Sequence, residues 1–187
     1  MNVYDFDKTI YRRDSTADFY LFCLKQKPSL CRFWPVQLFH AALFGLHLME
    51  KTRFKESFYR FMAALPEIEA MAEAFWDIHE KDILPWYREQ RRADDVIISA
   101  SPEFLLLPIC RRLGIGCLMA SRVDPATGRD TGVNCHGKEK VRRFREKFPK
   151  GRIDRFYSDS LSDTPLASIA RESFLVKGEK LQVWDKK

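Results

Sequence analysis

Two aspartates, Asp5 and Asp7, lie at the end of an apolar stretch that opens the chain. Residues 2–6 are predicted to form a short strand, and alternate residues of a strand face the same side, so the two carboxylates start out together. Carboxylates this close repel each other unless a proton or a cation lies between them. Mg²⁺ prefers hard oxygen ligands and keeps several waters, so such a pair beside a phosphate suits it. Taken alone, the pair is more often a solvated strand end.

A second polar place follows the apolar run 95–100, where Ser99 and Ser101 precede a helix predicted over 103–113. A hydroxyl beside the backbone N–H groups of a helix start forms a neutral cradle for phosphate oxygens. Ser101 is more simply explained as the N-cap of that helix. Ser99 is therefore the candidate phosphate ligand.

The third and fourth places carry lysines and acids. Lys138 and Lys140 precede an amphipathic helix, and a lysine there could neutralise charge that develops on a phosphoryl group. Lys140 is the better candidate, because it begins the apolar-periodic part, and Lys138 is the alternative. Asp159 and Asp163 follow an apolar strand, so one could ligate a metal while the other orients a ligand or the lysine. Helix capping by Asp163 is the competing interpretation.

The chain divides by pattern into a helical part and an alternating part. From Thr16 to about Arg91, apolar residues recur at three- and four-residue spacing, which predicts helices. Further on, predicted strands alternate with helices and imply a parallel sheet with right-handed crossovers. Ligands of such sheets bind beyond the carboxyl ends of the strands, so the four polar places should meet at one edge. The predicted strands cover residues 95–100, 115–121 and 153–157.

Three smaller features are predicted in the second half of the chain. Gly128 and Gly132 suggest a small hairpin, because glycine punctuates turns. A short helix is expected over Thr164–Arg171. A terminal hairpin is expected over Phe174–Trp184, with its turn at Lys177–Gly178.

In order and placement, the four motifs resemble those of the haloacid dehalogenase superfamily of phosphatases, in its phosphoserine-phosphatase-like branch (subfamily IB). They are D-x-D-x-T at Asp5–Thr9, the hydroxyl of Ser99, the lysine at Lys140 and D-x-x-x-D at Asp159–Asp163. The resemblance implies an α/β fold with a Rossmann-like parallel sheet core, formed by residues 1–14 and 92–187. A helical cap, residues 15–91, would be inserted after the first strand.

The resemblance further implies a magnesium-dependent phosphatase that forms an aspartyl-phosphate. Asp5 would be the nucleophile and a metal ligand, and Asp7 the general acid and base, its backbone carbonyl reaching the metal. A carboxylate nucleophile splits hydrolysis into two easier steps. A phosphotransferase with an acceptor other than water shares the first step and stays open. Among the other motif residues, Thr9 and Ser99 would bind phosphate oxygens, and Lys140 would stabilise the phosphoryl group. Asp159 would ligate the metal, and Asp163 would support the metal site.

Two positions depart from the pattern. Phosphoserine phosphatases carry a glutamate shortly after the first motif, where it meets the substrate amino group, and Asp14 holds the comparable place here. Asp14 is thus a candidate substrate residue, although capping of the next helix explains it equally well. Position 8 is lysine, where many relatives carry glycine.

The stretch Phe33–Met49 contains no Lys, Arg, Asp or Glu and is rich in Phe, Leu and Ala. A spanning helix needs about 20 apolar residues, so this stretch is too short to be expected to cross a bilayer. Basic residues flank it on both sides, which fits a helix lying on an anionic membrane surface. A buried cap helix or a dimer contact is the alternative.

That layout is similar to the phosphatidylglycerophosphate phosphatases of the same superfamily. A phospholipid-type phosphate monoester is therefore the specific expectation for the substrate, with a small soluble ester such as phosphoserine as the alternative.

Composition limits the remaining classes. Lys and Arg exceed Asp and Glu by 32 − 26 = 6, so an anionic partner is favoured. Nucleic acid is not expected, because the basic helix after Lys140 has an ordinary apolar face and a solvated one. Five cysteines without a C-x-x-C pair predict reduced, mostly buried thiols in a cytosolic protein. No signal peptide is expected, because Met1 runs straight into a predicted strand that ends in acids. The expected location is cytoplasmic, with a peripheral position at the inner face of the membrane if Phe33–Met49 contacts lipid.

Overall fold

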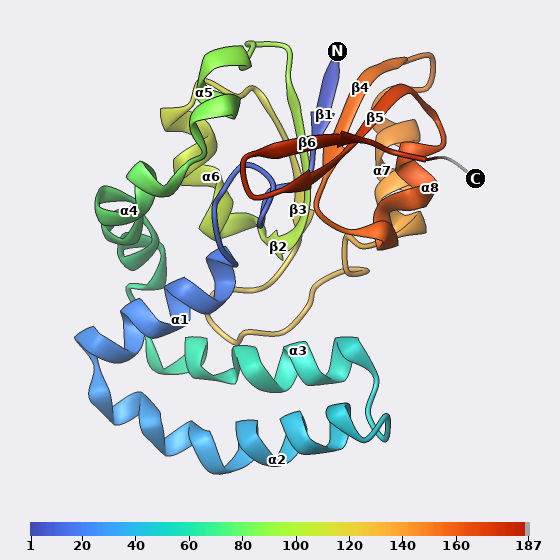
Figure 1. Ribbon diagram of the computed structural model, residues 1–187. Helices are drawn as coiled ribbons and strands as arrows, with labels where there is room; N and C mark the ends of the chain where they lie inside the picture. The colour runs from blue at the N-terminus through green and yellow to red at the C-terminus, as the bar shows by residue number, and fades with distance from the viewer. Residues whose placement is uncertain (186–187) are drawn as a thin grey trace.

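A six-stranded sheet runs through the molecule in the order β3-β2-β1-β4-β5-β6 (Figure 1). The structure is a computed structural model, and it describes residues 1–185. Strands β1 to β5 pair in parallel, and β6 pairs antiparallel with β5. The α/β fold with a mostly parallel sheet is therefore confirmed. The strands are β1 Asn2–Tyr4, β2 Val96–Pro102, β3 Cys117–Ser121, β4 Ile153–Ser158, β5 Ala170–Lys177 and β6 Lys180–Val183.

Strand β1 lies in the middle of the sheet, between β2 and β4. Val3 pairs with Val96 on one side and with Phe156 on the other. The chain order reverses direction across β1, and such a reversal opens a crevice at the carboxyl ends of the strands. The residues that follow β1, β2 and β4 therefore lie next to one another.

Helices alone fill the chain between β1 and β2, apart from the loop after β1. They are α1 Ser15–Gln26, α2 Trp34–Gly45, α3 Lys51–Tyr59, α4 Ile68–His79 and α5 Pro85–Gln90, joined by the 3₁₀ segments η1 Pro28–Phe33, η2 Arg60–Ala64 and η3 Glu80–Asp82. The later part of the chain adds α6 Glu103–Arg112, α7 Lys138–Lys147, η4 Leu161–Asp163 and α8 Thr164–Ala167.

The two faces of the sheet bury separate hydrophobic clusters, as strand alternation requires. Val3 and Ile98 point to the cluster that contains Phe144 of α7. Tyr4 and Ile97 point to the larger cluster, which helices α1, α4 and α6 cover. The sheet is thus a middle layer between two helical layers.

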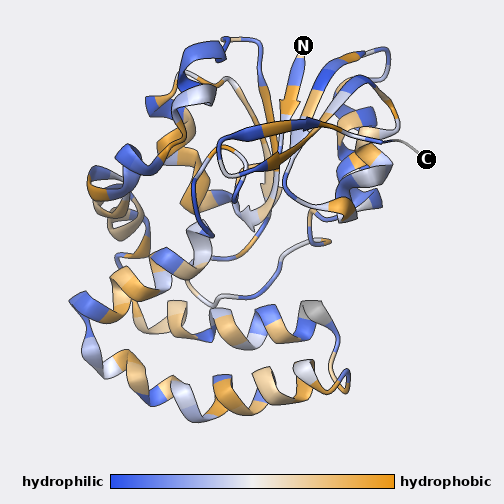
Figure 2. Cartoon of the chain, viewed as in Figure 1, coloured by the Kyte–Doolittle hydropathy of each residue, from blue (hydrophilic) through white to orange (hydrophobic). Residues whose placement is uncertain are grey.

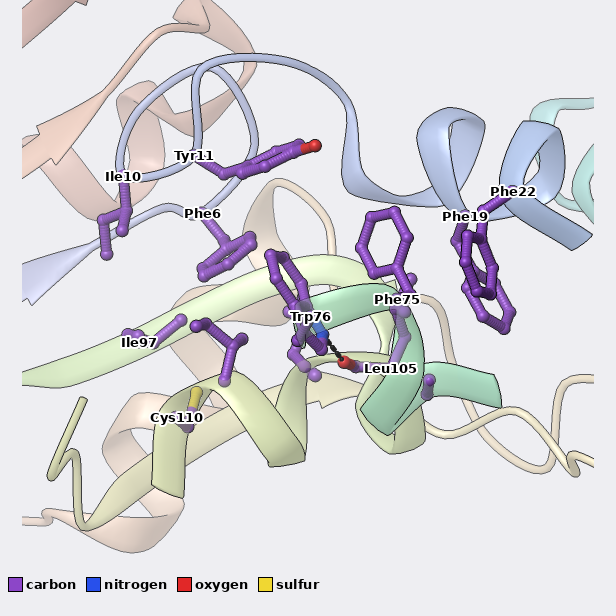
Figure 3. Packing of buried hydrophobic residues seen from close by; sticks show 14 of the residues in the cluster. Phe6, Ile10, Tyr11, Phe19, Phe22, Phe75, Trp76, Ile97, Leu105 and Cys110 are labelled. Atoms are coloured by element: carbon purple, nitrogen blue, oxygen red, sulfur yellow. Dashed lines mark hydrogen bonds between the residues drawn. The ribbon is translucent and has the colours of Figure 1, made fainter. Parts of the chain in front are cut away.

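Aromatic packing holds the loop after β1 against α4 (Figure 3). The Phe6 ring meets the Trp76 ring edge-on at 5.8 Å, and the Tyr11 ring meets it at 5.4 Å. Trp76 Nε1 donates a hydrogen bond of 2.6 Å to the carbonyl of Leu105 in α6. Because Phe6 lies between Asp5 and Asp7, this packing positions both acids.

Helices α2 and α3 form an antiparallel pair that stands away from the sheet (Figure 1). Gln37 ties the pair to α1, since its amide accepts from the Tyr20 hydroxyl at 2.7 Å and donates to the Phe58 carbonyl at 3.2 Å. Helix α4, by contrast, packs in the same cluster as β2 and α6. The division into a core and a cap at residues 15 and 91 stays a prediction.

Several predicted boundaries are wrong. The helix expected over Thr164–Arg171 ends at Ala167, because Ala170 begins β5 and pairs with Ile153. The hairpin expected near Gly128 and Gly132 is reduced to a single bridge between Val123 and Asp130. The terminal hairpin is present, with a longer first strand and its turn at Gly178.

Among residues 1–185, no helix is both long and apolar enough to cross a membrane. All five cysteines are free thiols: Cys23, Cys110 and Cys135 are buried, Cys117 is half-buried and Cys31 is exposed.

Gly128 brings the loop after β3 onto the backbone of the α3–η2 junction. Its φ is +70°, and a Cβ there would lie 2.1 Å from the Tyr59 carbonyl oxygen. We expect Gly128→Ala to lower the free energy of unfolding by at least about 2 kcal/mol, through left-handed backbone strain and this clash.

Urea unfolding checks this against two matched controls. Gly178→Ala has the same strained φ (+63°) but open space, so it should cost only about 1–2 kcal/mol. Gly132→Ala has neither feature, so its effect should stay within about 0.5 kcal/mol. Equal losses for Gly128→Ala and Gly178→Ala would contradict the close approach to Tyr59.

Candidate active site

One cavity of about 600 Å³ opens at the carboxyl ends of β1, β2 and β4. Seven of the predicted site residues line it, and they come from distant parts of the sequence. Helices α1 and α3 supply the opposite wall. The seven are Asp5, Asp7, Asp14, Ser99, Lys140, Asp159 and Asp163.

Lys140 is the centre of the site, with only 2% of its surface exposed. It lies in the first turn of α7, and its Nζ donates to Asp5 Oδ1 at 2.8 Å and to Asp163 Oδ2 at 2.7 Å. Burial by itself would lower the pKa of Lys140, but the two carboxylates outweigh it and the pKa is raised. The side chain is therefore a fixed positive charge. Lys138, the alternative candidate, is exposed and lies outside the cavity lining.

Asp163 has one satisfied oxygen and one that is not. Its Oδ2 accepts from Lys140 and from the buried Ser158 hydroxyl, the latter at 2.8 Å. Its Oδ1 is buried and has no hydrogen-bond partner among the described residues. Buried polar atoms are nearly always paired, so this oxygen is free to accept from a group that enters the cavity.

Asp5 is nearly buried and is fixed at both ends. Its backbone N–H donates to the Tyr157 carbonyl at 2.9 Å, which continues the β1–β4 ladder, and its carboxylate meets Lys140. Burial raises the pKa of Asp5, and the negative charges of Asp163 and Asp7 add to the rise against the lowering effect of Lys140. The site holds more negative charge than its own lysine offsets.

Asp7 accepts hydrogen bonds at both oxygens. The Ser15 backbone N–H donates to Oδ1 at 2.7 Å, and the Ser101 hydroxyl donates to Oδ2 at 2.5 Å. Burial, followed by the negative charge of Asp14, raises the pKa of Asp7 to about 6. The N-cap assignment of Ser101 is wrong, because Pro102 precedes the first turn of α6 and no side chain caps it. Ser101 instead orients Asp7.

The two predicted phosphate ligands lie differently. Ser99 lines the cavity, and its Oγ accepts from the Ser101 backbone N–H at 3.1 Å. Thr9 is fully buried behind the cavity wall, where its Oγ1 accepts from the Asp159 backbone N–H at 3.0 Å. In this structure Thr9 positions the loop that carries Asp159.

Asp159 and Lys8 also line the cavity. Partial burial raises the pKa of the Asp159 carboxyl, while the charge of Lys8 acts in the opposite direction. Lys8 has a φ of +56°, a conformation in which any residue other than glycine costs about 1–2 kcal/mol. Glycine would adopt this conformation without that cost. Here a strained backbone carries a cation into the site instead.

Asp14 is the N-cap of α1, since its Oδ1 accepts from the Ala17 backbone N–H at 2.9 Å. The capping interpretation is therefore confirmed, and the same side chain also lines the cavity. Its role in substrate binding stays a prediction.

Sequence reasoning missed the wall opposite the acids. Phe54, Lys55, Phe58 and Tyr59 reach the cavity from the α3 region, and His136 reaches it from the loop before α7. Lys55 Nζ donates to the Ala100 carbonyl at 2.9 Å. The helical spacing of Phe54 and Phe58 indicates one shared face, but no local signal says what that face meets.

The donor set fits a divalent cation of the Mg²⁺ type. Asp5, Asp159 and the free oxygen of Asp163 are hard oxygen donors around one cavity, and burial makes their negative charge costly without a cation. In the described part of the chain, no three acidic, histidine or cysteine side chains already surround one point. Mg²⁺ commonly binds one or two carboxylates and completes its coordination shell with water, so three protein side chains around one point are not required.

Replacing Lys140 should destabilise the fold strongly. Lys140→Met leaves two carboxylates buried without a counter-ion, at a cost of about 3–5 kcal/mol in the free energy of unfolding. The deficit should shrink as the pH falls, because the pKa of Asp5 is raised in the folded state, which then takes up a proton more readily than the unfolded state does.

Denaturant unfolding in EDTA at several pH values measures both effects. Lys138→Met, an exposed lysine two residues away, should change stability by no more than about 0.5 kcal/mol. A larger loss for Lys138→Met than for Lys140→Met would show that the lysine positions are misassigned.

Several solved structures share this fold. A protein of unknown function from Bordetella pertussis Tohama I superposes with a TM-score of 0.76 at 20% identity, covering 92% of this chain and 87% of that one. A phosphoserine phosphohydrolase-like protein from Francisella tularensis subsp. tularensis SCHU S4 superposes with a TM-score of 0.57 at 14% identity, covering 92% and 86%.

The sequence is also similar to Protein CicA of Caulobacter vibrioides, with 36% identity over 115 residues. That match covers 57% of this chain and 52% of the relative, so the chain spans about half the length of the curated relatives it matches. The family model for haloacid dehalogenase-like hydrolases matches residues 3–168. Together with the motif geometry around Lys140, this match shows that the chain belongs to the haloacid dehalogenase-like hydrolase family, as its four motifs predicted.

Proposed function

We propose that this chain is a magnesium-dependent phosphomonoester hydrolase that works through an aspartyl-phosphate on Asp5. The observation that carries the proposal is the placement of the Asp5 carboxylate against the buried ammonium of Lys140, at 2.8 Å, in a cavity that Ser99 and Asp159 also line. A preorganised cation beside a carboxylate nucleophile suits phosphoryl transfer, in which negative charge must be stabilised.

The proposed reaction has two steps. In the first, a carboxylate oxygen of Asp5 bonds to phosphorus while the bond to the ester oxygen breaks, and Asp7 donates a proton to the departing alkoxide. In the second, Asp7 takes a proton from water as that water attacks phosphorus, which releases inorganic phosphate and restores Asp5. Asp7 is suited to both transfers because Ser15 and Ser101 hold its carboxyl in one orientation.

Asp5, Asp159 and the backbone carbonyl of Asp7 are the groups that would hold Mg²⁺ in this proposal. When bound, the metal offsets the repulsion between the anionic nucleophile and the anionic phosphate. Asp163 supports the site by orienting Lys140 and by offering its free oxygen. Thr9 contributes by holding the Asp159 backbone.

The wall formed by α1 and α3, both within the proposed helical cap of residues 15–91, is the proposed contact for the alcohol part of the ester. This wall combines the rings of Phe54 and Phe58 with the Lys55 ammonium. An apolar surface beside a cation favours a phospholipid-type monoester, such as phosphatidylglycerophosphate, which carries a second anionic group. A small soluble ester such as phosphoserine is the alternative, and transfer to an acceptor other than water is a third. A cytoplasmic protein with peripheral membrane contact through Phe33–Met49 fits the lipid substrate.

Asp5→Asn should abolish turnover while the fold is retained. The variant removes the nucleophile, and Lys140 keeps Asp163 as its counter-ion, so stability should change little. We expect phosphate release from an aryl phosphate to fall by at least about 10³-fold. The wild type should also form a hydroxylamine-sensitive phosphoenzyme, which Asp5→Asn should lack. Asp154→Asn, an exposed control, should retain full activity. A folded Asp5→Asn variant with near-normal turnover would refute the nucleophile assignment.

The substrate class can be tested with a panel of esters, with and without Mg²⁺. The panel contains phosphatidylglycerophosphate in detergent, phosphoserine, a sugar phosphate and an aryl phosphate. We expect Mg²⁺-dependent turnover that is strongest on the lipid.

Lys55→Met should lower kcat/KM on the lipid about tenfold, because one charge contact is lost, while kcat/KM on the aryl phosphate should change less. The matched control is Lys25→Met, an exposed lysine of α1.

The outcomes of the panel separate the three alternatives. A soluble ester that is turned over fastest would contradict the lipid assignment and leave the hydrolase proposal intact. A phosphoenzyme that passes its phosphate to added alcohols in preference to water would favour a phosphotransferase.

A further inference from the structure

A second cavity, about 970 Å³ in volume, lies on the side of α3 that faces away from the catalytic cavity. It is lined by Arg53, Glu56 and Ser57, which follow one face of α3, and by Arg60 at the start of η2. Phe54 and Phe58 of α3 instead line the catalytic cavity. The two cavities share no lining residue. We call the second one the arginine groove, after the four arginines that line it, Arg32, Arg53, Arg60 and Arg129.

These arginines come from three parts of the chain that only the fold brings together. Arg32 lies in η1, Arg53 and Arg60 lie in α3 and at the start of η2, and Arg129 lies in the loop after β3. The close approach of Gly128 to Tyr59 holds that loop against the end of α3 and so places its neighbour Arg129.

The arginine groove carries unbalanced positive charge. Four guanidinium groups face one acid, Glu56, which leaves a formal charge of 4 − 1 = +3. Within residues 1–185, none of the four forms a salt bridge within 4.0 Å, although other arginines such as Arg13, Arg112 and Arg142 do. Like charges gathered in one groove repel, and a guanidinium fork matches the geometry of a phosphate. The groove therefore favours a phosphate-bearing ligand.

An exposed apolar helix continues from the arginine groove. Arg32 and Phe33 line the groove, and Trp34 begins α2 directly after them. Leu38, Phe39, Leu46 and Leu48 on and just beyond α2 are 61–72% exposed. Figure 2 shows α2 as a mostly hydrophobic helix at the end of the molecule farthest from the sheet. A contiguous apolar patch of this kind marks an interaction surface.

We propose that the arginine groove and the outer face of α2 form one surface that binds an anionic phospholipid bilayer. The arginines bind lipid phosphates, and the apolar side chains of α2 lie at the level of the acyl chains. Charge complementarity and the absence of charged residues from Phe33 to Met49 favour lipid over a polar polyanion. The proposal rests on the proposed function in one respect, since an enzyme bound to the membrane would meet a phosphate ester carried by a lipid. Binding to the bilayer itself requires no catalysis.

The test is sedimentation of the full chain with vesicles, in EDTA, so that neither Mg²⁺ nor turnover contributes. One set of vesicles is phosphatidylcholine alone, and the other also contains phosphatidylglycerol. We expect binding to the anionic vesicles that weakens with added salt, because surface charge is screened. Arg53→Ala/Arg60→Ala should weaken it about 30-fold, since each arginine near an anionic surface contributes about fivefold.

Two further variants separate charge from apolar contact. Arg111→Ala/Arg152→Ala removes the same charge from exposed positions outside the groove and should bind almost normally. Leu38→Ser/Leu46→Ser should weaken binding to anionic vesicles while the salt dependence stays. All variants should keep wild-type turnover of a soluble aryl phosphate, because none of the changed residues lines the catalytic cavity.

Three results would overturn the proposal. The first is equal binding to both kinds of vesicle, and the second is an equal loss of vesicle binding in the two arginine double variants. The third is a dimer of this chain that buries α2 and that the leucine variants dissociate. Salt-sensitive retention on RNA without vesicle binding would also overturn it and assign the groove to nucleic acid. Vesicle binding is measured without turnover, so a protein that does not bind vesicles would not contradict the proposed chemistry of Asp5. A protein that binds vesicles but has no phosphatase activity would not contradict the proposed membrane surface.

Discussion

A buried ammonium between two buried carboxylates is the constraint on which the cavity at the carboxyl ends of the strands depends. Lys140 reaches Asp5 after β1 and Asp163 after β4, so one side chain of α7 ties together two strand ends and a helix. Removing the lysine would leave two buried carboxylates without a counter-ion, whereas removing Asp5 would leave Lys140 paired with Asp163. The three side chains therefore fix the register of α7 against the sheet and hold the Asp5 carboxylate in place.

The rest of the site is a consequence of the sheet order. With β1 between β2 and β4, Asp7 comes within reach of Ser101, and Thr9 comes within reach of the Asp159 backbone. Packing of Phe6 against Trp76 locks the loop between the two acids from below (Figure 3). Motif residues far apart in the sequence thus orient one another through hydrogen bonds, which fix the side chains on this side of the cavity.

Helix α3 separates two surfaces of opposite character. Its Phe54 and Phe58 line the acidic cavity, and its Arg53 lines the basic groove together with Arg60 at the start of η2. The same arrangement places the apolar face of α2 at the periphery (Figure 2).

The sequence by itself determined the fold class, the family motifs and seven of the residues that meet in the cavity, because strand alternation and motif spacing are local properties. It favoured Lys140 over Lys138 from helical phase alone. Only the tertiary structure decided that Ser101 donates a hydrogen bond to Asp7 and does not cap a helix. It also placed Thr9 outside the cavity lining, and it brought Lys55 and His136 into that lining. It alone brought Arg129 beside Arg53. These contacts join residues tens of positions apart, and local patterns carry no record of which distant backbone or charge a side chain will meet.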